Sequence, residues 1–398
     1  MRDLRGLPEF CLLMLTLCGL CVQRSSAQTP VQDRSKGHPN RWLDLSQESA
    51  ADRLFSQPPN SPGYAVALIK DGEFAFSRGY GLANLDDAIP ITPKTSFHLA
   101  SLSKQFTAAA IALLILNHKI ALSDPVAKYI PEVAKYGRSL RIEHLVYMTS
   151  GIHEYTDVPR KNGVPWMAFY YFTRDEAIAT ALGPDQLEFV PGTKWAYRNI
   201  NYMLLTKIVE VVSHQPFAVF MRDRVFGPLG MSHSQINDDS TEVIPHRATG
   251  YALRSDPTVL KELASVGVSI KPGDGWARLV RVAPHFGGSG VFTTLEDLLL
   301  WDRNWYTASL AGPQFTELMN KRMKFEHDKD NDAFGLVWRS LYGHPMLDYS
   351  GGDTDASTYM ARFPEQHFTI ICLSNMPLGD TEDKAHALLE LLHGWGGL

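Results

Sequence analysis

The chain has 398 residues, of which 44% are hydrophobic and 20% are charged, so it can form a globular protein with a sizeable core, and its length favours two domains. Its formal net charge of -5 gives no electrostatic basis for binding nucleic acid, and we predict no nucleic-acid partner. It contains no internal repeat or low-complexity tract, which argues against a solenoid or fibrous protein.

Residues 1–27 are typical of a secretory signal peptide. Arg2 and Arg5 supply a basic start, the run 10–22 is apolar but too short to span a bilayer, and Ser25-Ser26-Ala27 offers small residues for cleavage. An uncleaved anchor is the alternative. We expect an exported protein, periplasmic or secreted, with no stable membrane anchor after cleavage.

Cysteine usage fits an exported chain that relies on its core rather than on disulfides. Cys11, Cys18 and Cys21 lie in the signal, and neither Cys18 nor Cys21 follows a small residue, so a lipoprotein anchor is not expected. The mature chain keeps only Cys372, which forms no intramolecular disulfide and is expected to be a small core residue on a strand.

The mature chain opens with a polar, flexible lead-in (28–45) and a short helix (49–56). Apolar runs at 64–70 and 73–78, joined by Asp71-Gly72, predict a β-hairpin. In the helix that is predicted from Ser101, the run from Phe106 to Leu116 is almost wholly apolar, which indicates that the helix is buried on all sides.

From about 124 to 247 the pattern is mostly helical, and β character then returns before a closing amphipathic helix. We therefore predict an α+β fold: one antiparallel sheet, flanked by helices and built from both chain ends, with a mostly helical domain inserted between. The predicted domain is 46–398, with an α/β part at about 46–123 and 280–398 and a helical part at about 124–279. We expect the functional site in the cleft between the two parts. The helices in the insert are predicted at 142–148, 175–182, 201–212 and 217–225, the later strands at 334–340, 357–363 and 367–373, and the last helix at 380–395.

Ser101 and Lys104 are the strongest candidates for catalysis. Three residues apart on a helix, the serine hydroxyl and the lysine amine lie on one face and can touch. Serine needs a base to become a nucleophile, and a lysine can be that base when burial or a neighbouring cation keeps it neutral. The alternative is a plain helix N-terminus, with Ser101 as the N-cap and Lys104 in solvent.

A second pattern, Tyr197-Arg198-Asn199, follows the turn at 191–193. In a Tyr-x-Asn on a loop, both side chains can point into one cleft, where the phenol could exchange a proton with a serine and the amide could hold a lysine and a substrate carbonyl. A buried tyrosine and a capping asparagine at a helix entry explain the same residues.

A third pattern is Tyr349-Ser350-Gly351-Gly352, which precedes the strand near Ser357. Glycines at a strand edge allow a substrate backbone to approach and expose amide N–H groups. A simple glycine-rich turn is the alternative.

Together these patterns resemble the motif series of serine beta-lactamases and penicillin-binding proteins, and most closely the class C beta-lactamase group with its related esterases and D-amino-acid peptidases. Other stretches look like landmarks of that family, so that the resemblance covers roughly 50 to 376 and implies a beta-lactamase/transpeptidase-like fold. These stretches are 79–84, 90–92, 144–151 and 287–297.

The resemblance implies a role for each matching residue. Ser101 is the acylated nucleophile, and Lys104 and Tyr197 share the general acid and base work. Asn199, Tyr349 and Gly351 bind substrate. The backbone N–H groups of Ser101 and Gly352 form the oxyanion hole, where each donor is worth about 2.7–4 kcal/mol to the transition state.

The chain departs from the family at Tyr349, where beta-lactamases of this group have lysine and many of the esterase-like members have histidine. A tyrosine is uncharged at neutral pH. Losing a charged hydrogen bond of roughly 1.5–3 kcal/mol would weaken handling of a penicillin carboxylate by about ten- to a hundredfold. Arg198 is one candidate for a replacement cation. The departure favours an ester, amide or D-peptide substrate.

Other patterns give no support for a metal or cofactor, and we predict neither. The run from Asp328 to Asp332 resembles the start of a calcium loop, but Ala333 and Arg339 occupy the positions that need glycine and glutamate. The fourteen histidines include no H-x-H or H-E-x-x-H motif. An aromatic run, which ends at Tyr171 and Phe172, is a candidate wall for the substrate entrance; its other members are Trp166, Phe169 and Tyr170.

The sequence therefore predicts an exported serine hydrolase that forms an acyl-enzyme with an ester, amide, D-amino-acid peptide or beta-lactam. Its partner is a small-molecule or peptide substrate, and its oligomeric state is open. A catalytically quiet protein of the same fold that binds beta-lactams or cell-wall peptides is the alternative, and a purely structural exported domain is the third reading.

Overall fold

The computed structural model describes residues 43, 45–158, 171–265, 267–279, 283, 286–323, 331–377 and 379–394, all within one compact unit that spans 41–398. The predicted signal peptide, the lead-in up to residue 42, the acidic run 328–330 and the aromatic residues 166–170 lie outside the described residues. Among the described helices, none combines the length and the apolar character needed to cross a membrane.

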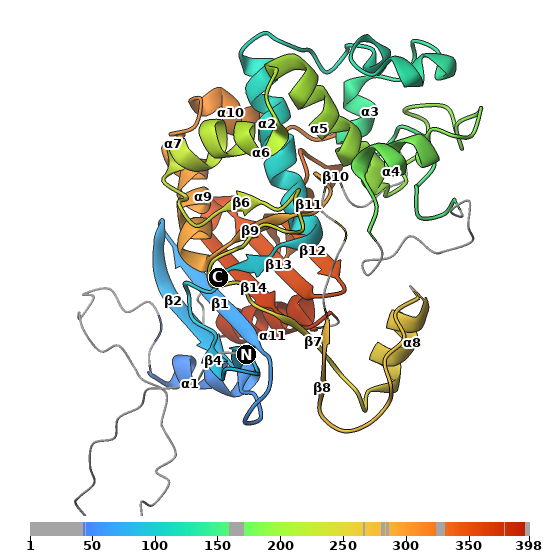
Figure 1. Ribbon diagram of the computed structural model, residues 1–398. Coiled ribbons are helices and arrows are strands. Elements are labelled where there is room, and N and C mark those ends of the chain that lie inside the picture. The colour runs from blue at the N-terminus through green and yellow to red at the C-terminus, as the bar shows by residue number, and fades with distance from the viewer. Residues whose placement is uncertain are drawn as a thin grey trace, which may run out of the picture. The chain divides into compact units, whose positions relative to one another are not determined.

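A seven-stranded antiparallel sheet forms the centre of this unit (Figure 1), in the order β10-β11-β12-β13-β14-β1-β2. The two N-terminal strands are the predicted hairpin, and they pair with the C-terminal strands through β1 and β14, where Val66 lies opposite Cys372. The predicted fold class is therefore confirmed. The strands are β1 (Tyr64–Lys70), β2 (Glu73–Tyr80), β10 (Asn331–Asp332), β11 (Val337–Leu341), β12 (His344–Asp353), β13 (Ala356–Phe363) and β14 (Phe368–Ser374).

Helices cover both faces of the sheet, which explains why β1 is a continuous apolar run rather than an alternating one. Val66 and Leu68 belong to the core beneath α1 (Leu45–Phe55) and α11 (Thr381–Gly394). Ala65 and Ala67 belong to the larger core on the opposite face, which includes α2 (Lys104–Leu116) and α9 (Leu295–Thr307). Cys372 is a free, buried cysteine on β14, as the sequence predicts.

Helix α2 leads from the sheet into the helical part of the molecule (Figure 1) and is buried for nearly its whole length. It packs against α5 and α6, and its Phe106 ring lies 4.5 Å from that of Trp301 on α9. The other helices of this part are α3 (Ile142–Val146), α4 (Arg174–Ala181), α5 (Asn199–Ser213), α6 (Phe217–Met221) followed by one π-helical turn (Arg222–Phe226), α7 (Gly227–Leu229) and α10 (Pro313–Met319).

Three short sheets complete the fold. In one of them β5 (Phe97–His98) pairs with β9 (Val291–Thr293), so the segment just before Ser101 lies beside the segment that follows residue 286. The strand β6 (Gln235–Ile236) completes that sheet. The remaining pairs are β3 (Leu82–Asn84) with β4 (Ile89–Pro90), and β7 (Gly250–Leu253) with β8 (Trp276–Leu279), between which the chain forms α8 (Pro257–Ser265).

Two predicted elements are corrected by the structure. The glycine-rich segment at 349–352 is not a turn before a strand but part of β12, in register with β13, because pairing with β13 outweighs the weak strand propensity of glycine. The helix predicted from Ser101 begins as a 3₁₀ turn, η1 (Ala100–Ser103), and becomes α-helical at Lys104. The other 3₁₀ turns are η2 (Val126–Lys128), η3 (Pro131–Tyr136) and η5 (Pro364–Gln366).

Candidate active site

Ser101 lies in the turn η1, between β5 and α2, and its side chain faces a pocket. The residue before it, Ala100, has a φ of +48°, a left-handed conformation that costs a non-glycine residue of order 1–3 kcal/mol. Such local strain is held in place by the surrounding packing, and Ala100 and Leu102 are fully buried. The turn therefore fixes the direction of the Ser101 hydroxyl.

Lys104 is fully buried one turn later, so the alternative with Lys104 in solvent is wrong. Its Nζ lies 3.1 Å from Ser101 Oγ, 2.5 Å from Tyr197 Oη, 3.0 Å from Asn199 Oδ1 and 2.7 Å from the carbonyl oxygen of Gly288. An ammonium has three donors for these four oxygens. The four oxygens therefore share three donors, and the lysine is held from four sides.

Tyr197 completes a compact triangle with Ser101 and Lys104. Its Oη lies 2.6 Å from Ser101 Oγ, within reach for direct proton transfer. Asn199, the first residue of α5, orients the same lysine through its side-chain oxygen. The first two sequence motifs thus meet at one point.

Glu154 supports this arrangement through the backbone of Asn199, and none of the sequence motifs identified it. It is 5% exposed, and its carboxylate accepts hydrogen bonds from the backbone N–H groups of Asn199 and Tyr155. Burial raises the pKa of Glu154 to about 7, although these two N–H groups and the charge of Lys104 oppose that rise. The only signal in the sequence was an acidic residue three positions after the stretch 144–151, which resembles a landmark of the family.

The third motif lies on β12, and its residues approach the site in different ways. Tyr349 packs against the core that contains α2, and burial, with Tyr197 and Tyr202 nearby, raises its pKa, so its phenol stays neutral. Gly351 lies against the nucleophile turn, where a Cβ would come within 2.5 Å of the Leu99 carbonyl oxygen. Gly352 has open space and lines the pocket.

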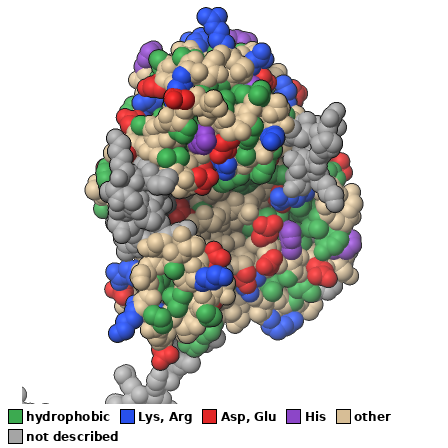
Figure 2. Space-filling view, turned by 90° about the vertical axis from the view of Figure 1, so that its right-hand side faces the viewer, with side chains coloured by type: hydrophobic (Ala, Val, Ile, Leu, Met, Phe, Trp, Pro, Cys, Tyr) green, Lys and Arg blue, Asp and Glu red, His purple; other side chains and the backbone are tan. Residues whose placement is uncertain are grey.

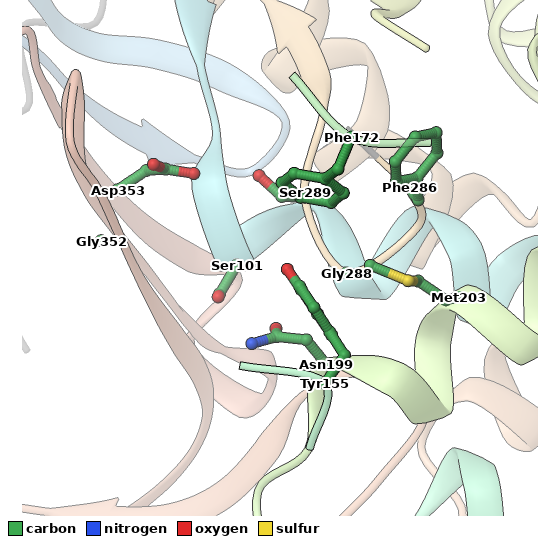
Figure 3. A pocket seen from close by; sticks show the side chains of 10 residues that line it. All are labelled: Ser101, Tyr155, Phe172, Asn199, Met203, Phe286, Gly288, Ser289, Gly352 and Asp353. Carbon is green, nitrogen blue, oxygen red and sulfur yellow. The ribbon is translucent and has the colours of Figure 1, made fainter. Parts of the chain in front are cut away.

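The pocket is open to solvent and has a volume of about 110 Å³. Its polar lining includes Ser101, Asn199 and Ser289, and its apolar wall includes Phe172 (Figure 3). Figure 2 shows a hollow on one face of the molecule, floored mainly by backbone and uncharged polar side chains with charged groups at its rim. The remaining lining residues are Tyr155, Met203, Phe286, Gly288, Gly352 and Asp353.

Four other predicted residues lie away from the described pocket lining. Arg198 forms a paired contact with Glu188, at 2.8 and 3.1 Å from its two carboxylate oxygens, so its charge is already compensated. Tyr349 and Gly351 back the site rather than line the pocket. Tyr171 is exposed, whereas its neighbour Phe172 forms part of the wall.

Comparison with known proteins gives a consistent picture. A sequence model described as "Beta-lactamase" matches residues 51–394. A D-aminopeptidase from Gluconobacter oxydans (strain 621H) is 29% identical over 329 residues, which are 82% of this chain and 58% of that protein. The chain therefore spans less than two thirds of this relative.

Solved structures share the fold. A D-amino acid amidase from Ochrobactrum anthropi SV3, complexed with D-phenylalanine, superposes with a TM-score of 0.74 at 18% identity, covering 87% of this chain and 99% of that one. An octameric penicillin-binding protein homologue from Pyrococcus abyssi superposes with a TM-score of 0.72 at 24% identity, covering 88% and 77%. With the family match over most of the domain, the predicted family is confirmed: the chain belongs to the beta-lactamase family of serine hydrolases.

Proposed function

We propose that this protein is an exported hydrolase that forms an acyl-enzyme at Ser101 and cleaves amides or esters of small acyl groups, with D-aminoacyl amides and peptides as the favoured class. The observation that carries the proposal is the contact of Ser101 Oγ with both Tyr197 Oη and Lys104 Nζ. Export rests on the signal-like residues 1–27, whose sequence indicates a periplasmic or secreted protein.

Acylation follows from this geometry. Tyr197, with its proton drawn toward Lys104, accepts the Ser101 proton as Oγ attacks the substrate carbonyl carbon. The tetrahedral intermediate then collapses, and the same pair returns the proton to the departing amine or alcohol. Asn199 keeps the lysine in place through both transfers.

The developing oxyanion is assigned to the backbone N–H groups of Ser101 and Gly352, two residues that line the same pocket. Each donor placed for the transition state contributes about 2.7–4 kcal/mol. Strand β12 pairs with β11 up to Asp348, and at Gly352 it pairs with β13 through Ser357, so Gly352 is presented from the sheet.

Three observations support the substrate class. The pocket is small and has an aromatic wall. The neutral Tyr349 supplies no cation for a beta-lactam carboxylate, which argues against strong beta-lactamase activity. A relative is a D-aminopeptidase, and a protein of the same fold is a D-amino acid amidase.

The test is a panel of four substrates with the mature protein and Ser101→Ala: a D-alanine p-nitroanilide, its L-isomer, a p-nitrophenyl ester and a chromogenic cephalosporin. We expect turnover of the D-anilide and the ester, slow turnover of the cephalosporin, and a loss of at least about 10³-fold in Ser101→Ala. A fluorophosphonate should label Ser101 in the wild type only.

The alternatives make different predictions in the same experiment. Slow labelling of Ser101 without turnover of any substrate would instead favour a binding protein. Equal turnover in wild type and Ser101→Ala would refute the proposed nucleophile. Equal rates for the D- and L-anilides would remove the stereochemical part of the proposal and leave the serine hydrolase.

A further inference from the structure

A second serine opens onto the pocket beside Ser101. Ser289, on the segment before β9, lines the pocket together with Ser101 (Figure 3). Its Oγ lies 2.7 Å from His98 Nε2, and His98 Nδ1 lies 2.8 Å from Asp355 Oδ1. Hydroxyl, imidazole and carboxylate thus form the connected series found in Ser–His–Asp hydrolases.

Two contacts of Asp355 guide the assignment of the protons in this series. Arg247 Nη2 lies 3.3 Å from its second oxygen and compensates the carboxylate charge. An ionised carboxylate only accepts hydrogen bonds, so we assign the contact of Nδ1 as a donation from His98 to Asp355. In the neutral imidazole, Nε2 is then an acceptor, and the Ser289 hydroxyl donates to it.

Burial and packing hold the imidazole in this position. His98 is 3% exposed and Asp355 is 5% exposed, and the imidazole stacks on Phe292 with ring centroids 5.1 Å apart. Ser289 is the half-exposed end of the series and faces the pocket. The series therefore runs from the buried carboxylate of Asp355 to the place where substrate would sit.

Asp353 lies close by: one carboxylate oxygen each of Asp353 and Asp355 and one His98 nitrogen fall within 4.8 Å of one another. These are residue types that bind metals. However, Asp355 is already shared between His98 and the Arg247 guanidinium, so a cation there would face a fixed positive charge. The contacts of Asp355 with His98 and Arg247 therefore favour proton transfer along this series over metal binding.

We propose that Ser289, His98 and Asp355 form a proton relay that activates the water molecule for deacylation of Ser101. This proposal rests on the acyl-enzyme proposed above. As the water oxygen bonds to the acyl carbon, its proton passes to Ser289 Oγ while the Ser289 proton passes to His98 Nε2. Asp355 stabilises the resulting imidazolium. The bond to Ser101 Oγ then breaks, and Ser101 takes a proton from the Tyr197–Lys104 pair. His98 releases its proton to solvent, from which that pair is recharged.

The chemistry of the second half-reaction supports this assignment. In the acyl-enzyme the Ser101 oxygen carries no proton, and a water molecule must lose one instead. A positioned base contributes about 10²–10⁴-fold to such a step. The position where many related esterases have histidine is Tyr349 here, and an imidazole reaches the pocket through His98 and Ser289 instead.

The test separates acylation from deacylation with p-nitrophenyl acetate, by stopped-flow release of nitrophenol and by intact mass of the protein during turnover. In Ser289→Ala we expect an acylation rate within about threefold of wild type, steady-state turnover about 10²-fold lower, and accumulation of acylated Ser101. His98→Gln should show the same defect, and the double variant should be no worse than either. Hydroxylamine, which attacks the ester without a base, should restore turnover.

A matched control is Ser232→Ala. Ser232 is exposed, its Oγ lies 3.3 Å from His233 Nδ1, which is 3.5 Å from Asp297 Oδ1, and it does not line the pocket. This variant should keep both rates. Wild-type turnover in Ser289→Ala or in His98→Gln would overturn the relay, as would a loss of turnover without acyl-enzyme. Failure of wild-type Ser101 to acylate would overturn the proposed function itself, and the relay with it.

Discussion

Tyr349 lies behind the proposed substrate site and stands where a cation is expected in beta-lactamases of the class C group. Its phenol is neutral and lies near Tyr197. We predict that Tyr349→Lys raises the ratio of cephalosporin to ester turnover by about ten- to a hundredfold, the value of one charged hydrogen bond to a carboxylate. Side-by-side kcat/KM measurements give this ratio. Tyr349→Phe, which adds no charge, is the control and should keep the wild-type ratio; a folded Tyr349→Lys protein with the same ratio would contradict the prediction.

Glu154 is a buried carboxylate whose pKa rises from 4.5 to about 7 on folding, mainly through burial. The unfolded chain therefore loses this proton at lower pH than the folded protein does. The stabilisation by the protonated form is complete below about pH 4.5 and is lost as pH rises through 7, by on the order of 3 kcal/mol. We predict that Glu154→Gln does not lose stability in this way. From pH 5 to pH 8 the free energy of unfolding of the variant should therefore increase relative to that of the wild type.

Denaturant unfolding at several pH values measures this difference. Glu365→Gln, which changes an exposed carboxylate on η5, is the control and should follow the wild-type pH dependence. Parallel curves for wild type and Glu154→Gln would show that the buried carboxylate does not titrate in this range.

At the scale of elements, the close approach of β12 to the turn η1 determines whether the site forms. A Cβ on Gly351 would lie 2.5 Å from the carbonyl oxygen of Leu99, which precedes η1, and 2.4 Å from Thr358 Oγ1 on β13. The Thr358 side chain and either β12 or the turn would therefore have to move. Displacing catalytic groups by about 1 Å can cost 10²-fold in rate. We predict that Gly351→Ala slows fluorophosphonate labelling of Ser101 by about that factor.

Gly352→Ala is the matched comparison, because a Cβ there meets open space and the backbone N–H is retained. It should fold as wild type does and label much faster than Gly351→Ala. Equal labelling rates in the two variants would show that contact between β12 and η1 does not hold the nucleophile.

Strand β12 also shows where sequence patterns fail. The run Asp-Tyr-Ser-Gly-Gly, with its two glycines, is typical of a turn. It nevertheless belongs to a strand that is stabilised by pairing with β11 and β13. By contrast, the hairpin at Asp71-Gly72 and the apolar helix after Ser101 were predictable, because a local turn signal and an unbroken apolar run identify them. Helix α9 was not predicted, although Thr294 caps it by accepting from the Asp297 N–H.

At the scale of the whole molecule, the sequence predicted a sheet made from both chain ends, and the pairing of β1 with β14 confirms it. The motifs identified the residues that meet at Lys104 because each contains chemistry that is recognisable in a few adjacent letters. The partners Glu154, His98 and Asp355 carry no such local signature. His98 and Asp355 are 257 residues apart, and only the folded chain shows that they touch.

The same architecture predicts which parts of the chain the site needs. Helix α11 covers one face of the sheet with Leu388, Leu389 and Leu392, all within the core beneath α1 and α11. The segment between β7 and β8 has instead a small core of its own, to which Leu263 and Val268 belong. Leu253 and Trp276 are paired at the ends of those strands, so a two-residue turn can join them.

We therefore predict that replacing residues 254–275 with Asn-Gly leaves a folded protein in which Ser101 still takes a fluorophosphonate at close to the wild-type rate. None of the described residues around Lys104 or the pocket comes from that segment. A second variant ends the chain at residue 379 and so lacks α11, which, like the segment 254–275, supplies none of the described pocket residues. This variant should lose labelling, because one face of the sheet is then exposed to solvent. Circular dichroism and labelling of both proteins check this contrast. Loss of labelling in a folded 254–275 replacement would mean that this excursion shapes the nucleophile turn.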